Sequence, residues 1–272
     1  MSNDIISILS LNFVQRALFG GILISLCCAL LGVILVLKRY SMIGDGLSHV
    51  AFGALGIATA LGFSPMYFTI PVAILAAFLL LRLKDNSNIK GDSAIAMISI
   101  SSLATGVMFI SYTSGGNTDV YNYMFGSILA LTEQDIIMIA TLSVFIIVMY
   151  IFTYNKMFLV TFDEKFAKST GTKTEFYNMT IALLSAIAIV IGMKMMGAML
   201  ISALIIFPSL TAMRIFRNFK SVVISSALMS VINFCIGMLL SIIFNTPTGA
   251  SIVVIDIIMF LIFTLIGKLM HK

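Results

Sequence analysis

The chain has 272 residues, of which 60% are hydrophobic and only 10% are charged, and its mean hydropathy is +1.13. A chain of this composition cannot cover itself with polar surface, so it is excluded from the soluble class and indicated as an integral membrane protein. Its net charge of +5 comes from 16 basic residues spread over short loops. Because they form no continuous patch, the charge indicates membrane topology and no nucleic-acid partner.

Long uncharged runs predict the membrane-spanning helices. Single runs reach the roughly 20 residues that a helix needs to cross about 30 Å of hydrocarbon. Two runs are long enough for two crossings and contain their own breaks, at Phe63-Ser64-Pro65 and at Asn245-Thr246-Pro247-Thr248-Gly249. In chain order the spans are predicted in Leu18–Leu37, Gly46–Leu81 (two), Ser93–Thr118, Ile136–Asn155, Phe176–Met193, Met195–Met213 and Ser221–Ile255 (two).

The sequence therefore predicts an all-α, polytopic membrane protein: a helical bundle of about nine transmembrane helices, with eight as the alternative count. Continuous apolar runs exclude the alternating pattern of a membrane β-barrel. The first run has no small-residue cleavage pattern, so it is interpreted as a retained span. Residues 1–272 are expected to form a single transmembrane domain.

The distribution of basic residues predicts the orientation of the chain. With nine crossings, fourteen of the 16 Lys and Arg residues fall on one side, and only Arg16 and Lys194 fall on the other. Basic residues are retained on the cytoplasmic side of the membrane when loops are short. The expected orientation is N-terminus outside and C-terminus inside.

Two loops are long enough to carry function. The interval from Gly91 to Asn155 contains no Lys or Arg but carries Asp92, Asp119, Glu133 and Asp135, so its outer part is either a surface that attracts cations or an ordinary outer loop. The cytoplasmic loop at about 155–177 has Leu159, Phe162 and Phe166 at helical spacing before Gly171, which is a plausible helix stop. That pattern predicts a short amphipathic helix for a partner, for the membrane surface or for the bundle itself.

The segment Met42-Ile43-Gly44-Asp45-Gly46-Leu47-Ser48-His49 places a carboxylate and an imidazole four residues apart at the edge of a predicted span. On a helix these two residues share a face, and His49 lies about 12 Å from the helix start. An oxygen and a nitrogen donor suit Zn²⁺, Mn²⁺ or Fe²⁺, and the same groups can relay protons. The alternative is a simple hydrogen bond between His49 and the Asp45 carboxylate near a helix N-terminus.

Asp256 is a second carboxylate within a predicted span, and it costs free energy there unless it is paired or hydrated. This cost does not by itself decide where the Asp256 side chain lies. It can contact a neighbouring helix, a dimer interface, a water cavity or the transport path.

Several sequence blocks together resemble the membrane permease subunit of zinc- and manganese-type ABC importers. They are Leu35-Val36-Leu37-Lys38-Arg39, Ile43 to Ala51, Gly91-Asp92-Ser93-Ala94-Ile95, Tyr123 to Leu129, Gly197 to Leu204 with Pro208, and Pro247-Thr248-Gly249-Ala250. The resemblance covers nearly the whole chain, and the block from Asp45 to His49 is its most specific part.

The resemblance implies a permease of the bacterial cytoplasmic membrane that imports a divalent transition metal, with zinc favoured and manganese or iron as alternatives. The metal is then a transported substrate, and no permanently bound cofactor is expected. The implied partners are a second copy of the chain in a homodimer, membrane lipid, an extracytoplasmic metal-binding protein and cytoplasmic ATP-binding subunits.

The resemblance also implies roles for individual residues. Asp45 and His49 correspond to the cation route, and Ser48 and Asp92 match family positions without a defined role. The ATPase-coupling surface corresponds to residues of the cytoplasmic loop, namely Phe162, Asp163, Phe166, Ala167 and Gly171.

The sequence lacks the Gly-x-x-x-x-Gly-Lys-[Ser/Thr] loop that binds ATP phosphates. ATP hydrolysis is therefore expected in a separate subunit, and the chain is not expected to be an enzyme. The alternative function is a secondary metal transporter in which Asp45, His49 and Asp256 relay protons.

Overall fold

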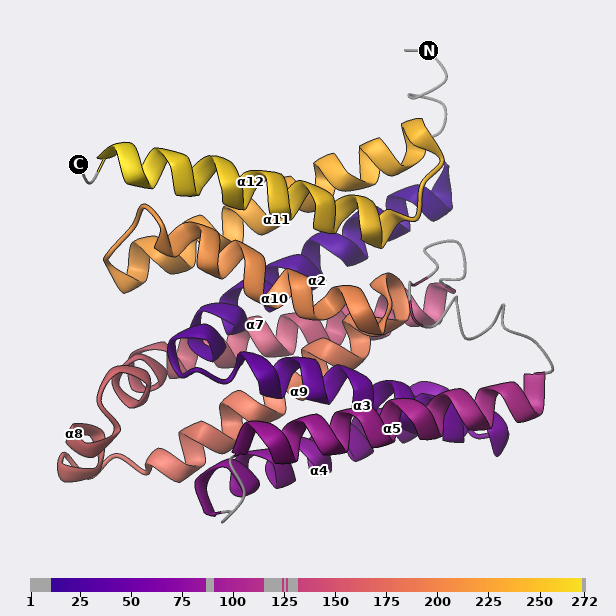
Figure 1. Ribbon diagram of the computed structural model, residues 1–272, viewed down its shortest axis with the longest axis horizontal. Coiled ribbons are helices and arrows are strands. Elements are labelled where there is room, and N and C mark those ends of the chain that lie inside the picture. The colour runs from indigo at the N-terminus through magenta and orange to yellow at the C-terminus, as the bar shows by residue number, and fades with distance from the viewer. Residues whose placement is uncertain (1–10, 87–90, 115–123, 125, 127–131, 271–272) are drawn as a thin grey trace.

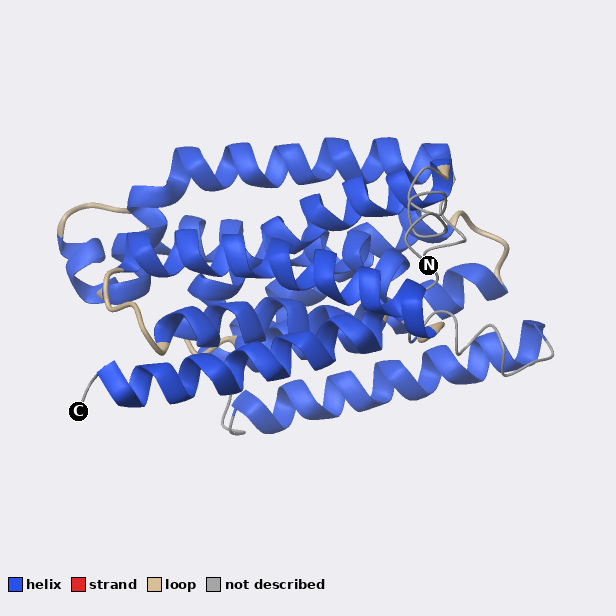
Figure 2. Ribbon diagram, turned by 90° about the horizontal axis from the view of Figure 1, so that it is seen from above, coloured by secondary structure: helices blue, strands red, loops and turns tan. Residues whose placement is uncertain are grey.

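The computed structural model describes residues 11–86, 91–114, 124, 126 and 132–270. Helices make up almost all of this part of the chain, and no strand occurs in it (Figure 2). The all-α fold class is therefore confirmed for the described residues. The helices are α2 (Asn12–Leu37), α3 (Ser41–Ala60), α4 (Pro65–Asn86), α5 (Gly91–Ser114), α7 (Glu133–Phe162), α8 (Glu164–Ser169), α9 (Thr174–Met196), α10 (Ala198–Met213), α11 (Phe219–Phe244) and α12 (Thr248–Met270).

All of these helices except the six-residue α8 run back and forth along one bundle, and the start of α2 and the end of α12 lie at opposite ends of it (Figure 1). Seven helices in the described residues are long and apolar enough to cross a membrane, and α10 contributes a shorter apolar helix. α3, which carries Asp45 and His49, runs beside them (Figure 1). The predicted count of about nine crossings is consistent with this arrangement.

The breaks predicted in the two long apolar runs are confirmed. Gly62 has a φ of +72°, which glycine adopts without strain, and Pro65 opens α4, where its missing N–H is not needed. α11 ends at Asn245, whose left-handed φ of 51° stops the helix, and α12 begins after Pro247. Local turn residues therefore divide each run into two helices.

The junction between α9 and α10 lies three residues later than the sequence predicted. Lys194 was expected to separate the two spans, but it belongs to the last turn of α9. The chain reverses at Gly197, which has a φ of 88°. A lysine can remain in a helix near its end if its ammonium group finds a partner, whereas a left-handed backbone favours glycine.

α2 and α9 form the centre of the bundle. α9 contacts α2, α3, α4, α7 and α10, and nearly every residue from Thr180 to Met196 is buried. α11 and α12 lie along one edge of the bundle, and α4 and α5 lie along the opposite edge (Figure 1). The bundle therefore holds α3 between a buried centre and the α4–α5 edge.

Glycines allow α3 and α5 to approach each other closely. A Cβ at Gly53 would lie 2.5 Å from the carbonyl oxygen of Ser102, and a Cβ at Gly56 would lie 2.7 Å from that of Gly106. Small residues at such positions are typical of contacts between membrane helices, where van der Waals packing replaces the hydrophobic effect. This contact fixes the position of α3, and with it the faces on which Asp45 and His49 lie.

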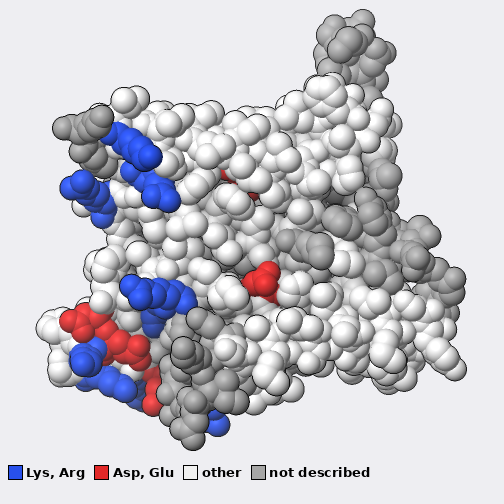
Figure 3. Space-filling model, viewed as in Figure 1, with Lys and Arg blue, Asp and Glu red and all other residues white. Residues whose placement is uncertain are grey.

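The basic side chains on the face shown in Figure 3 gather at the end of the bundle where α8 lies, here called the α8 end. Lys and Arg are grouped there with several acidic side chains, and the opposite end of this face shows no basic group among the described residues. This asymmetry agrees with the split of basic residues predicted from the sequence.

The contact between α3 and α5 predicts the effect of a single methyl group. Gly53→Ala forces the Ser102 carbonyl away, so we expect the free energy of unfolding to fall by about 1–3 kcal/mol. Gly44→Ala on the same helix is the matched control, since a Cβ there meets nothing within 4 Å. Thermal unfolding of both variants in the same detergent measures the difference, and equal midpoints would contradict the close contact.

Candidate functional site

Asp45 and His49 lie in the first half of α3, on the face that also carries Met42. The side chain of Asp45 is 45% exposed and that of His49 is 18% exposed. Exposure therefore decreases along the face as the helix runs away from the α8 end. The pair therefore opens onto the surface of the single chain.

The two side chains are close but not hydrogen-bonded to each other. His49 Nε2 lies 3.7 Å from Asp45 Oδ2, which is beyond hydrogen-bond distance. Two ligands of one tetrahedral Zn²⁺ are about 3.4 Å apart, given metal–ligand distances of about 2.1 Å. A small shift would therefore let one divalent ion contact both groups. The alternative prediction, a hydrogen bond between His49 and the Asp45 carboxylate, is therefore wrong for this structure.

His49 Nδ1 is buried and has no hydrogen-bond partner among the described residues. In resident metal centres the second ring nitrogen is almost always held by a carboxylate, a carbonyl or a water. The described residues also contain no group of three or more His, Cys, Asp or Glu side chains that could hold a metal ion. The pair thus offers two donors and little support, which suits transient contact better than permanent binding.

Ser48 faces away from this pair. Its hydroxyl donates to the Asp45 backbone carbonyl at 2.7 Å and lies 3.4 Å from the hydroxyl of Ser202 on α10. Ser48 is fully buried. It therefore joins α3 to α10, and it can affect Asp45 only through the backbone.

The other predicted acidic residues are not brought to the pair in the described contacts. Asp256 is fully buried between α12 and α11, where Asn233 Nδ2 donates to its Oδ1 at 2.7 Å. Asp256 Oδ2 and Asn233 Oδ1 have no partner among the described residues. Asp92 belongs to the first turn of α5, and its side chain lies outside the described residues.

The predicted amphipathic helix of the cytoplasmic loop is divided in two. α7 continues to Phe162, the backbone turns at Asp163 (φ −145°, ψ 91°), and α8 follows as a separate helix. The Asp163 carboxylate accepts a hydrogen bond from the Phe166 amide at 2.8 Å and so caps α8. A single helix across this loop was the wrong prediction, because Asp163 favours the cap over a helix interior.

Gly171 ends α8 as predicted. It has a φ of 78°, its amide donates to the Lys168 carbonyl at 3.1 Å, and the Thr172 amide donates to the Ala167 carbonyl at 2.9 Å. This pair of bonds is the Schellman motif. Ala167 is fully buried, whereas Phe162 and Phe166 are each more than half exposed. The exposed part of the predicted coupling surface is therefore aromatic, and Ala167 lies beneath it.

A polar network attaches α8 to the bundle. Asn178 Nδ2 on α9 donates to Glu164 Oε1 at 3.1 Å, and Lys38 Nζ bonds Asn178 Oδ1 and lies 3.9 Å from Glu164 Oε2. The Lys38 side chain is only 5% exposed. Lys38 ends α2 three residues before α3 begins, so the network connects α8 to the turn that leads into Asp45 and His49.

The sequence did not reveal this network. In the sequence, Lys38 is only one of the basic residues that predict the orientation. No sequence pattern singled out Asn178. The two lie 140 residues apart in the chain, so no local spacing relates them. Only the folded arrangement of α2, α8 and α9 brings them together.

At the opposite end, the two basic residues that broke the charge pattern both form ion pairs. Arg16 pairs with Glu133, and Lys194 pairs with Asp135. Asp135 also closes a capping box with Thr132 at the start of α7. Two of the acidic residues that were read as a possible cation-attracting surface are thus neutralised by the chain's own cations.

The fold and the charge asymmetry define a polytopic helical membrane protein whose α3 carries a carboxylate–imidazole pair. Residues 10–267 match the family described as "ABC 3 transport family". This match spans almost the whole chain, and the chain belongs to that family.

Characterised relatives and a solved structure agree with this membership. The chain is 27% identical over 248 residues to the "Manganese transport system membrane protein MntC" of Halalkalibacterium halodurans, covering 91% of this chain and 85% of that protein. It is 31% identical over 235 residues to the "High-affinity zinc uptake system membrane protein ZnuB" of Buchnera aphidicola, covering 86% and 90%. A structure of PsaBC from Streptococcus pneumoniae in complex with Fab has a TM-score of 0.88 and 29% identity, covering 97% of this chain and 95% of that one.

The two ion pairs at the opposite end differ in burial, which predicts a difference in stability. Lys194→Met leaves the buried Asp135 carboxylate without its cation, and we expect a loss of about 2–4 kcal/mol in the free energy of unfolding. Arg16→Met removes the exposed pair with Glu133, and we expect a loss below about 1 kcal/mol. Denaturant or thermal unfolding in detergent measures both, and equal losses would contradict the difference in burial.

Proposed function

We propose that this chain is the permease subunit of an ABC importer for a divalent transition metal. The observation that carries the proposal is the Asp45–His49 pair, a nitrogen and an oxygen donor 3.7 Å apart on α3, a helix that packs among the apolar helices of a chain in the ABC 3 transport family. Ionisable side chains at such depth are costly and mark ion pathways. The substrate passes this pair and is not retained, and the chain itself is not an enzyme.

Zn²⁺ is the first candidate for the substrate, and Mn²⁺ is the alternative. An imidazole nitrogen and a carboxylate oxygen are ligands that Zn²⁺ accepts in tetrahedral sites, and Mn²⁺ and Fe²⁺ use the same groups. The relatives support both ions, since MntC is named for manganese and ZnuB for zinc. The donor set alone does not rank them.

The path requires a second copy of the chain. One Asp45–His49 pair supplies two ligands, whereas Zn²⁺ is held by about four. Two copies related by a two-fold axis along the path would supply two carboxylates and two imidazoles. The partly exposed Asp45 supports this arrangement, because a carboxylate that faces a second copy is exposed when the chain stands alone.

The two ends of the bundle are assigned to different partners. The α8 end, with its grouped basic residues, is the cytoplasmic side, and α8 with Phe162, Asp163 and Phe166 docks the ATP-binding subunit there. The opposite end, which carries the chain's N-terminal side, receives the metal from an extracytoplasmic binding protein. The membrane is the bacterial cytoplasmic membrane, with the N-terminus outside and the C-terminus inside.

Lys38 transmits movement of α8 to the metal pair. When α8 moves with the ATP-binding subunit, Glu164 and Asn178 act on Lys38, and Lys38 is one short turn away from α3. Asn178 is the centre of this connection, because its side-chain amide donates to Glu164 on α8 and its side-chain oxygen accepts from the buried Lys38 ammonium group.

Ser48, Asp92 and Asp256 have secondary places in the proposal. Ser48 sets the backbone of Asp45 from the α10 side. Asp256 holds α12 to α11 through Asn233 and stands outside the path. Asp92 keeps its family match as a possible point on the cation route.

Loss of either donor is expected to abolish import. Asp45→Asn and His49→Ala each remove a ligand, and we expect metal uptake to fall at least tenfold, which corresponds to about 1.4 kcal/mol. Uptake of radioactive Zn²⁺ and Mn²⁺ by cells that depend on this chain measures the effect and ranks the two ions. Asp256→Asn is the control, which should insert and transport normally.

The same assay separates the two energy sources. Uptake should continue when a protonophore collapses the proton gradient while cellular ATP is kept constant. Uptake that stops under these conditions would favour the secondary transporter. Normal uptake by the Asp45→Asn, His49→Ala double variant would remove the pair from the path.

The exposed aromatic face of α8 predicts how the ATP-binding subunit is held. Phe166→Asp places a charge on an apolar contact, and we expect co-purification of that subunit with the chain to be lost, because burying an unpaired charge is unfavourable. Phe176→Asp, an equally exposed phenylalanine at the start of α9, is the matched control. Undiminished co-purification by the Phe166→Asp variant would count against docking at α8.

A companion variant tests transmission apart from docking. Lys38→Met keeps the surface of α8 intact, so the ATP-binding subunit should still co-purify. ATP hydrolysis should then no longer respond to metal-loaded binding protein in proteoliposomes. A normal response in this variant would show that Lys38 is not the connection.

A further inference from the structure

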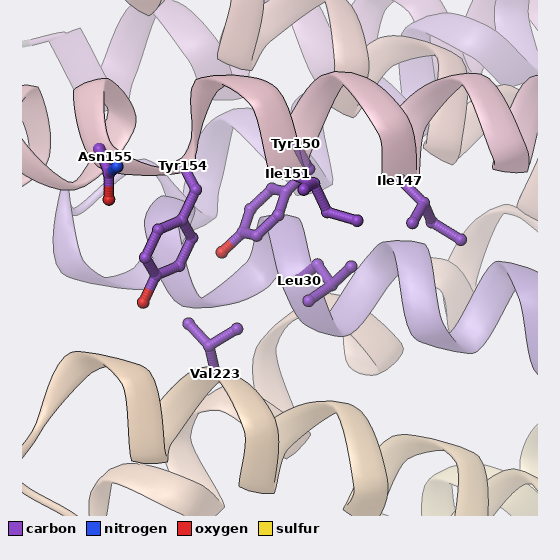
Figure 4. A pocket seen from close by; sticks show the side chains of 7 residues that line it. All are labelled: Leu30, Ile147, Tyr150, Ile151, Tyr154, Asn155 and Val223. Carbon is purple, nitrogen blue, oxygen red and sulfur yellow. The ribbon is translucent and has the colours of Figure 1, made fainter.

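A cavity of about 350 Å³ lies between α2, α7 and α11, toward the α8 end of the bundle. Its walls are mostly apolar, and polar atoms are contributed by three residues of α7. The lining residues are Leu30, Ile147, Tyr150, Ile151, Tyr154, Asn155 and Val223 (Figure 4). None of these residues belongs to the metal pair or to α8, so the cavity is a separate feature of the molecule.

Tyr150 gives this cavity an unused hydrogen-bond donor. The residue is only 3% exposed, and its hydroxyl has no hydrogen-bond partner among the described residues. Figure 4 shows its hydroxyl oxygen directed toward the space between Leu30, Tyr154 and Val223. A buried hydroxyl without a partner costs about 1–3 kcal/mol. A molecule that brings an oxygen acceptor into the cavity removes that cost.

The cavity is reached from the outer surface of the bundle, through the membrane-facing side of α7. Ile151, on its wall, is 66% exposed, and the next residue along, Phe152, is more exposed still. Toward the α8 end the space is limited by the rings of Tyr154 and Phe219, whose centroids are 5.4 Å apart. Exposed apolar side chains on a membrane helix contact acyl chains, and tyrosines beside them are typical of the level of the head groups.

The charges near the cavity favour an anionic occupant. Lys220 lies one turn before Val223 on α11 and is exposed, and Asn155 adds an amide donor. No lining residue is acidic. Basic side chains next to pockets between membrane helices on the cytoplasmic side bind anionic lipid head groups, and here that side chain is Lys220, just outside the lining. A second copy of this chain that packed on this face would bring its own Lys220 toward the cavity. An acidic residue in the lining would then have to complement that lysine, and the lining contains none.

We propose that this cavity binds one phospholipid of the cytoplasmic leaflet with an anionic head group. One acyl chain occupies the apolar wall formed by Leu30, Ile147 and Val223. A glycerol-ester oxygen accepts the hydrogen bond from the Tyr150 hydroxyl, and the phosphate lies beside Lys220 at the level of Asn155. The lipid fills the gap between α11 and α7, and α7 is the helix that leads into α8.

The experiment uses the purified full chain in detergent, titrated with phosphatidylglycerol or with phosphatidylcholine, and counts bound lipid by mass spectrometry of the intact protein. Tyr150→Phe removes only the hydroxyl, and we expect phosphatidylglycerol to bind about five- to tenfold more weakly, the loss of one buried hydrogen bond. Tyr112→Phe, on a tyrosine that is 89% exposed, is the matched control and should bind as the parent chain does. Lys220→Gln should abolish the preference for phosphatidylglycerol over phosphatidylcholine.

Val223→Trp fills the cavity and should prevent specific lipid binding. A midpoint of thermal unfolding within a few degrees of that of the parent chain would show that the Val223→Trp variant folds. If this variant does not fold, the Tyr150→Phe variant alone tests the proposal. Equal phosphatidylglycerol affinity in the parent chain and Tyr150→Phe would overturn the proposal. A dimer that dissociates on Tyr150→Phe substitution without loss of bound lipid would also overturn it, since a second copy would then be the occupant.

Discussion

The cost of polar groups inside a membrane is the constraint on which this structure depends. Most buried polar side chains meet it by pairing within the chain: Lys38 bonds Asn178, Lys194 bonds Asp135, and Asn233 bonds Asp256. Asp45 and His49 do not meet it in this way, since their nearest side-chain atoms are 3.7 Å apart and His49 Nδ1 has no partner in the described part. His49 Nδ1 is one of several buried polar atoms without a partner in the described residues, but His49 is the one that lies beside a partly exposed carboxylate.

Close helix packing holds Asp45 and His49 on the partly exposed face of α3. Gly53 and Gly56 let the α3 backbone touch α5, and Ser48 joins α3 to Ser202 on α10. α3 therefore cannot rotate to bury Asp45 without losing these contacts. Backbone contacts of this kind are rigid, because there is no flexible side chain between the helices to absorb a shift. The cost of the unpartnered His49 Nδ1 is thus offset by packing elsewhere on the same helix.

Features with local causes were predictable from the sequence, and features with distant causes were not. The helix breaks at Pro65 and Asn245 and the stop at Gly171 follow from the backbone preferences of single residues, and the apolar runs follow from the thickness of the membrane. The break at Asp163 was missed because an apolar periodicity continues across it, although an acid before a new helical turn is a recognisable cap. The hydrogen bonds of Lys38 and Lys194 join helices that are far apart in the chain. The distribution of charges along the sequence could therefore not predict the partners of these two lysines.

Under the proposed function, incomplete coordination at Asp45 and His49 is itself a requirement of transport. A site that supplied four protein ligands and a held second ring nitrogen would bind a transition metal as structural sites do, and release would be slow. Conduction needs binding that is strong enough to draw an ion from water and weak enough to let it leave. Two donors from each chain meet this condition if a second copy completes the site only while the path is assembled. In the proposed mechanism, the connection from α8 through Asn178 and Lys38 to the start of α3 allows a movement at the α8 end to change the distance between the pairs of the two copies, and so to convert a binding geometry into a releasing one.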